Sequence, residues 1–137
     1  MINFKNRQLI PILNYLSAVE LQPKASRVRT KLKALLMVKI EDMTSGEMEL
    51  LEKFGVKDSD GKLVENDGGY TLVPETAQSF HQEKAILLDE EIQINVVELK
   101  ERLPNLIKNL EASDITLSGE EAEAFDLLLD ALEREVG

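Results

Sequence analysis

Cysteine and tryptophan are absent from this sequence, and only six of its 137 residues are aromatic. The lack of cysteine excludes disulfides, thiolate nucleophiles and cysteine-ligated zinc or iron–sulfur sites, and it fits a reducing cytoplasm. With so few aromatic side chains, the core must consist mainly of Leu, Ile, Val and Met. That composition suits the packing of helices.

Long apolar runs are also lacking. A membrane-spanning helix needs about 20 apolar residues, whereas the longest candidate here, Ala34 to Ile40, is interrupted by Lys39. The amino terminus has no apolar segment followed by the small-residue cleavage site of a signal peptide. We therefore expect a cytoplasmic protein that does not bind a membrane.

Recognisable catalytic and metal-binding motifs are missing. His81 is the only histidine, and neither a Gly-x-Ser-x-Gly turn nor a phosphate-binding loop occurs. The segment from Val56 to Asp67 matches a calcium loop only at Asp58, Asp60 and Gly61, because its first and last ligand positions are wrong. Ordinary turn chemistry explains that segment better. We predict a protein that is not an enzyme, with no catalytic, cofactor or metal site and no cofactor.

Charge is sorted along the chain, whose formal net charge is −10. The first forty residues hold eight of the sixteen Lys and Arg residues and only one of the 26 Asp and Glu residues. Most of these cations form a basic segment, which consists of Lys24, Arg27, Arg29, Lys31 and Lys33. Since phosphate repels the acidic molecule as a whole, direct nucleic-acid binding is disfavoured.

The pattern of apolar residues and turn signals predicts a mainly helical α+β fold. The length fits a single domain, 1–137, in which a β-hairpin at 57–74 is free to project. A long central helix from about residue 24 to 54, which Gly55 ends, is expected to pack with shorter helices. Gly46 is a point where this helix could bend. Its buried stripe is predicted to consist of Ala25, Val28, Leu32, Leu35, Leu36, Met43, Leu50 and Phe54. One further short strand is expected at 92–96. Asn6 and Ser118 are predicted to cap the first and last helices, and the last helix is expected to turn an apolar stripe that ends at Val136 toward the core.

Two interpretations of the basic segment remain open. On a helix, Arg29 and Lys33 lie on one side of the buried stripe, while Lys24, Arg27 and Lys31 lie on the other. The cations could form a docking surface for a partner, with an acidic protein favoured over nucleic acid. The favoured alternative is that they meet the acidic face of another helix, such as the last one, through surface pairs of about 0–1 kcal/mol each.

A second apolar set on the same helix points to self-association. It lies well away from the buried stripe, and a helix that is apolar on more than one face is either central to the fold or shared between subunits. We therefore expect a homo-oligomer. The candidate oligomer face consists of Ala34, Met37, Val38 and Met48.

Several segments resemble an uncharacterised family of small proteins, phage domain of unknown function 1617, from tailed phages and prophages of Gram-positive bacteria. The resemblance is carried by Lys5-Asn-Arg-Gln-Leu-Ile-Pro11, Leu21-Gln-Pro-Lys-Ala-Ser-Arg-Val-Arg-Thr-Lys-Leu32, Leu50-Leu-Glu-Lys-Phe-Gly-Val-Lys-Asp-Ser-Asp-Gly-Lys62, Ile92-Gln-Ile94 and Leu117-Ser-Gly-Glu-Glu121. It implies a phage origin but assigns no site.

Together these features lead us to expect a non-enzymatic phage protein that acts through protein–protein interaction. The leading form is an accessory or chaperone-like factor in virion assembly, above all of the tail, that binds a phage structural protein or a host protein. The alternative is an acidic inhibitor that mimics nucleic-acid charge to block a host defence or DNA-binding protein. The expected location is the host cytoplasm during phage replication, or the virion itself.

Overall fold

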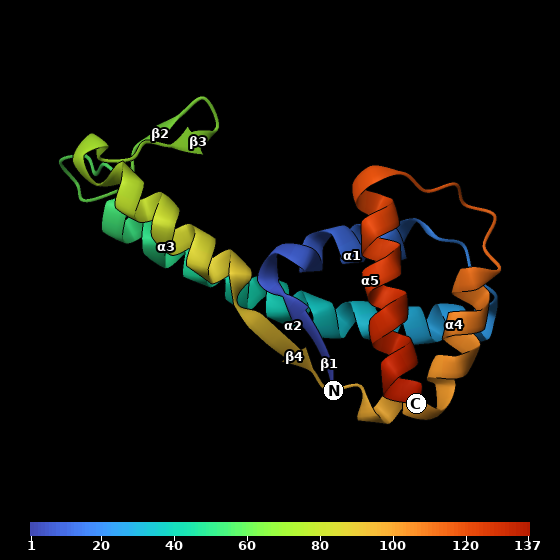
Figure 1. Cartoon of the computed structure of the whole chain (residues 1–137). Helices are drawn as coiled ribbons and strands as arrows, with labels where there is room; N and C mark the ends of the chain where they lie inside the picture. The colour runs from blue at the N-terminus through green and yellow to red at the C-terminus, as the bar shows by residue number, and fades with distance from the viewer. The chain divides into compact units, whose positions relative to one another are not determined.

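The computed structural model describes all 137 residues, which form five α-helices, two 3-10 helices and two small antiparallel sheets (Figure 1). The predicted mainly helical α+β class is confirmed. The chain forms two compact units, residues 1–40 with 91–137 (unit 1) and residues 41–90 (unit 2). A single domain stays a prediction, because compactness alone does not decide whether the units fold separately.

Unit 1 begins with a strand that the sequence pattern did not predict. Strand β1 (Ile2–Lys5) pairs antiparallel with β4 (Glu91–Ile94), with Ile2 opposite Ile94. Helix α1 (Asn6–Ala18) follows β1 directly. Asn6 was predicted as the cap, but it is the first helical residue, and the amide of Lys5 instead donates to Oε1 of Gln8 at 2.8 Å.

The predicted long helix is confirmed almost to the residue as α2 (Pro23–Phe54). Its first half contributes one face to the core of unit 1. The buried side chains on that face are Ala25, Val28, Leu32 and Leu36, which follow one another at helical spacing. These four belong to the predicted stripe. The predicted stripe differs from the structure in two ways. Ile40 is buried although it was not assigned to the stripe, and Leu35 and Leu50, which were assigned to it, are only half-buried.

The carboxyl-terminal part of unit 1 is helical, as expected. A 3-10 helix, η2 (Val97–Arg102), leads into α4 (Leu103–Glu111), and α5 (Gly119–Val136) packs against α1 and α4. Ser118 is the N-cap of α5, as predicted, although its side chain forms no capping hydrogen bond. Val136 was predicted to face inward, but it is 40% exposed because it follows the last buried turn of α5.

Unit 2 contains the rest of α2, the predicted hairpin and one further helix. The hairpin strands are β2 (Glu65–Asn66) and β3 (Gly69–Tyr70), slightly displaced from the predicted positions. The turn between them has positive φ angles of 51° at Asp67 and 81° at Gly68, as type I′ turns require. A 3-10 helix, η1 (Pro74–Thr76), precedes α3 (Ala77–Asp89).

Gly46 was considered a point where α2 could bend, yet the helix runs through it without a break. A Cβ atom at this position would lie 3.2 Å from Cδ1 and Cδ2 of Leu87 on α3. This separation is tighter than most contacts of real Cβ atoms. Gly46 therefore gives the two helices of unit 2 room to pack closely.

Tyr15 on α1 is a buried polar residue in the core of unit 1. Only 1% of it is exposed, its hydroxyl has no hydrogen-bond partner, and its ring packs edge-on against Phe125 at 5.3 Å between centroids. Burial raises the pKa of the phenol to about 12. An unsatisfied buried hydroxyl lowers stability, so the hydroxyl of Tyr15 is costly to the fold although its ring is well packed.

Replacement of Tyr15 by Phe is expected to raise the free energy of unfolding by about 1 kcal/mol at neutral pH, because it removes the orphaned hydroxyl. It should also change the response to alkali. The tyrosine in the unfolded chain ionises near pH 10, whereas the folded one keeps its proton up to about pH 12. Wild-type stability should therefore fall between these values.

Urea unfolding followed by far-ultraviolet circular dichroism at about pH 8 and about pH 11 measures this difference. The loss of stability between the two pH values should be smaller in Tyr15→Phe than in the wild type. Equal losses in the two proteins would show that the phenol does not resist ionisation in the folded state.

Candidate functional site

The basic segment lies on the first half of α2, within unit 1. The predicted division into two flanks is borne out by the surroundings of the side chains. Lys24, Arg27 and Lys31 are exposed and share one side of the helix, whereas Arg29 is half-buried on the other side. Lys33 is half-buried and forms no ion pair. The five cations therefore do not form one continuous surface.

Arg29 serves the architecture of unit 1. Its Nη1 donates hydrogen bonds to the backbone oxygens of Leu16, at 3.0 Å, and Val19, at 2.6 Å, at the end of α1. Its Nη2 donates to Oγ of Ser26 at 2.9 Å. The last carbonyls of a helix have no partner within the helix, and a cation is favourable there. Arg29 thus ties the end of α1 to α2.

The other flank of the basic segment opens onto a hollow of about 430 Å³. Lys24, Arg27 and Lys31 line it from α2, and Arg102 adds a fourth cation from the opposite wall. The remaining lining residues are Val28, Glu101 and Asn105. With four cations and one carboxylate, the hollow is positive in a chain that is strongly negative overall. It is therefore suited to carboxylates.

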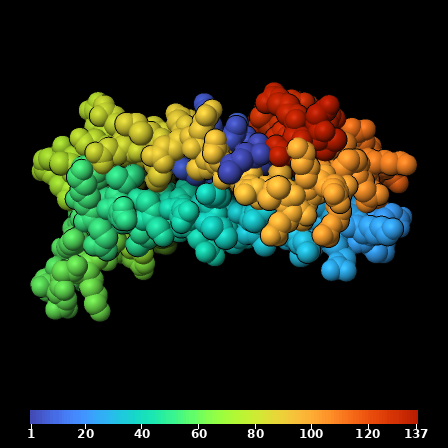
Figure 2. Space-filling view, turned by 90° about the horizontal axis from the view of Figure 1, so that it is seen from below, coloured from blue at the N-terminus to red at the C-terminus, as the bar shows by residue number.

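Two further hollows continue along α2 and are more apolar. One, of about 420 Å³, shares Lys31 with the basic hollow and is lined by Ala34, Leu35 and the 63% exposed Val97. The next, of about 650 Å³, shares Leu35 with it and includes Val38. We call these three hollows the α2 groove. One wall is α2 from Lys24 to Lys39, and the other is the segment 91–105, which Figure 2 shows alongside α2.

The expected pairing of the basic segment with the last helix is not found within the chain. No ion pair joins Lys24, Arg27 or Lys31 to any carboxylate, and Arg29 binds backbone oxygens instead. The outward carboxylates of α5 are likewise exposed and without an ion pair. They are Glu123, Asp126, Asp130 and Glu133.

The side chains of the candidate oligomer face are exposed in both units. In unit 1, Ala34 is exposed, Met37 is 39% exposed and Val38 is 56% exposed. In unit 2, Met48 is 38% exposed. Exposed apolar side chains grouped at helical spacing are a common feature of interaction surfaces. Whether they join copies of the chain stays a prediction.

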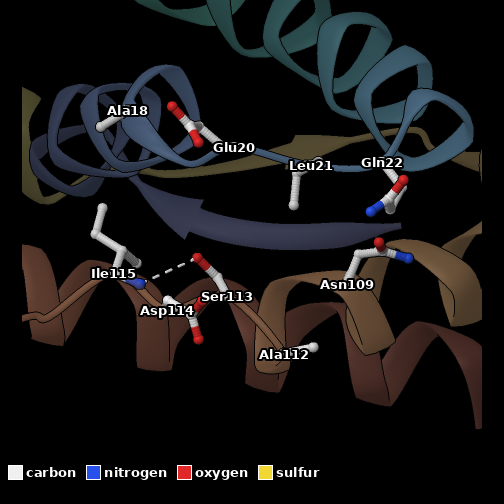
Figure 3. Close-up of a pocket in the computed structure, with 9 residues that line it drawn as sticks. All are labelled: Ala18, Glu20, Leu21, Gln22, Asn109, Ala112, Ser113, Asp114 and Ile115. Atoms are coloured by element: carbon white, nitrogen blue, oxygen red, sulfur yellow. Dashed lines mark hydrogen bonds between the residues drawn. The ribbon is translucent and has the colours of Figure 1, made fainter.

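A separate hollow of about 730 Å³ lies between the loop after α1 and the end of α4 (Figure 3). It is lined mainly by polar groups, and in its wall the amide of Ile115 donates to Oγ of Ser113 at 3.3 Å. Its carboxylates, Glu20 and Asp114, have no histidine or cation beside them in the lining. The sequence pattern did not single out these loop residues, because they have no periodicity or motif.

Other sequence candidates have structural roles. Oδ1 of Asp58 accepts hydrogen bonds from the amides of Asp60 and Lys62, as in an ordinary turn. The ring of His81 packs edge-on against Phe80 at 5.4 Å. No group of three or more His, Asp or Glu residues is arranged to hold a metal ion. No helix is long and apolar enough to cross a membrane.

Comparison with known proteins gives one family. The model of the family described as "Protein of unknown function (DUF1617)" matches residues 1–136. No curated protein and no solved structure matches the chain. The family match confirms the resemblance to an uncharacterised family and covers both compact units, while the phage origin stays a prediction.

Proposed function

The chain belongs to the DUF1617 family, and from this premise we propose that it is a non-enzymatic phage protein that acts by binding other proteins. Its task is that of an accessory or chaperone-like factor in virion assembly, with the tail as the favoured target. The phage setting rests on the resemblance of the segments at 5–11 and 21–32 to proteins of tailed phages and prophages. The expected place of action is the host cytoplasm, or the virion.

The α2 groove is the observation that carries the protein-binding role. It combines unpaired cations at one end with exposed apolar side chains such as Val38 and Val97 at the other. Apolar surface favours association, and charged groups at the rim select partners and raise the rate of encounter. A partner with carboxylates beside apolar side chains fits such a groove.

Deletion of the gene from a phage that encodes it tests the assembly role. We expect lysates with particles that lack tails or have malformed ones under the electron microscope, and a fall in plaque titre of several orders of magnitude. A plasmid copy should restore both. Normal particles at normal titre would refute the assembly role, whatever the oligomeric state of the protein.

The alternative function, an acidic inhibitor that mimics nucleic-acid charge, is supported by unit 2. Residues 41–90 hold 13 Asp and Glu residues against four Lys and Arg residues. A phosphate mimic should bind a basic host protein with an affinity that falls steeply with salt, because salt screens the attraction. Binding to host DNA-binding proteins that is the same at low and high salt would exclude this function.

A further inference from the structure

Two stripes of charge on unit 1 have opposite sign and the same length. On α2, Lys24, Arg27 and Lys31 follow one another at intervals of three and four residues, and on α5, Asp126, Asp130 and Glu133 do so at four and three. The end residues of each stripe are seven positions apart, or about 10 Å along the helix. All six side chains are exposed and form no ion pair within the chain.

Beyond the charged residues, the apolar side chains next to the two stripes also match in position. Three residues after Lys31, the α2 groove becomes apolar, with Ala34, Leu35 and Val97 around one hollow. Three residues after Glu133, α5 presents Val136, which is 40% exposed. If the two helices run parallel, alignment of the charges therefore also brings Val136 to the apolar hollow.

We propose that α5 of one copy lies in the α2 groove of a second copy. The carboxylates of Asp126, Asp130 and Glu133 face Lys24, Arg27 and Lys31, and Val136 enters the hollow beside Ala34. This inference rests on the proposed function, because it assigns an occupant to the protein-binding α2 groove, and it gives an interface to the homo-oligomer expected from the sequence. The groove and α5 are different surfaces of the same copy. Each copy can therefore place its α5 in the groove of one neighbour and accept the α5 of another, so that rings, open chains or a reciprocal dimer form.

The matching stripes favour a second copy as the occupant. The basic hollow is a local positive region that attracts carboxylates. The net charge of −10 repels nucleic acid and a second copy alike at long range, and what favours the copy is a carboxylate stripe of the same length as the cation stripe. In a second copy, the spacing of the carboxylates is already set by the folded helix α5. Because the backbone of that helix is already ordered, binding adds no cost of backbone ordering to the translational, rotational and side-chain entropy that any association loses.

The test is sedimentation velocity of the full chain at about 50 mM and about 500 mM NaCl. The wild type should associate at low salt and dissociate at high salt. The variants Arg27→Glu/Lys31→Glu and Asp126→Lys/Asp130→Lys should each raise the dissociation constant at least about tenfold. A mixture of the two variants should associate again, because each reversed stripe then meets one of opposite sign.

Matched controls separate this interface from a general effect of charge. Lys62→Glu/Lys108→Glu and Glu75→Lys/Glu111→Lys change the net charge equally at exposed positions outside the groove and α5, and they should associate like the wild type. Circular dichroism should give the same helix content for every variant. A monomeric wild type, unaltered association of either the groove variant or the α5 variant, or no recovery in the mixture would each overturn the proposal. Loss of tails after gene deletion would still support the proposed function.

Discussion

Replacement of Leu128 by Ala is expected to lower the free energy of unfolding by about 3 kcal/mol. Leu128 lies on the inner face of α5, is 0% exposed, and belongs to the helix that packs against both α1 and α4. Removal of three buried methyl and methine carbons costs their transfer free energy and leaves a cavity that neighbouring side chains fill only in part. Urea unfolding followed by circular dichroism measures the loss.

Its neighbour Leu127 provides the control. This side chain is 37% exposed, and its replacement by Ala should cost less than about 1 kcal/mol, since little apolar surface is lost and Ala favours a helix. Both substitutions remove the same atoms from the same helix. Equal losses in the two variants would mean that α5 does not pack in the orientation described.

Replacement of Arg29 by Ala is expected to lower the free energy of unfolding by about 2–3 kcal/mol. The change removes the two hydrogen bonds to the oxygens of Leu16 and Val19 and the one to Ser26. It leaves carbonyls at the end of α1 without a partner, in a position that is partly shielded from water. Thermal unfolding should show a correspondingly lower Tm.

Arg27→Ala is the matched control, two residues away on the same helix. Arg27 is exposed and forms no ion pair, so its loss should change stability by less than about 0.5 kcal/mol. Arg29→Lys should recover only part of the loss, because a single ammonium cannot repeat the fork of guanidinium donors. A destabilised Arg27→Ala beside a stable Arg29→Ala would reverse the roles assigned to the two residues.

The helices of this fold were predictable because their signals are local. The length of α2 follows from its apolar spacing, Pro23 at its start and Gly55 beyond its end. The hairpin turn at Asp67 and Gly68 follows from the residues themselves, which tolerate positive φ. Such features depend on neighbours along the chain, so a single sequence contains them.

Strand β1 was not predictable in the same way. Its four residues pair with β4, about ninety positions further along the chain, and a short segment has no local signal for such a distant partner. The exposure of Val136 was missed for a related reason. Helical spacing places it near the inner stripe, but whether a side chain is covered depends on which element lies opposite.

The candidate site was predictable in part. Helical projection separates Arg29 from Arg27 and Lys31, and the structure bears this out. The sequence did not predict which parts of the chain contact each flank of the basic segment. Arg29 donates hydrogen bonds to backbone oxygens at the end of α1. On the other flank, the segment 91–105, which includes Val97 and Arg102, forms the second wall of the groove. Both contacts arise only when distant parts of the chain fold together.

The burial of Tyr15 has a practical consequence for optical spectroscopy. Without tryptophan, the ultraviolet absorbance and fluorescence of the chain come mainly from Tyr15 in unit 1 and Tyr70 in unit 2. Tyr70 is 38% exposed, and the neighbouring Glu65 carboxylate raises its pKa too, whereas burial raises that of Tyr15. Tyr15→Phe leaves fluorescence from unit 2 alone and Tyr70→Phe leaves it from unit 1, so each compact unit contains its own intrinsic fluorophore.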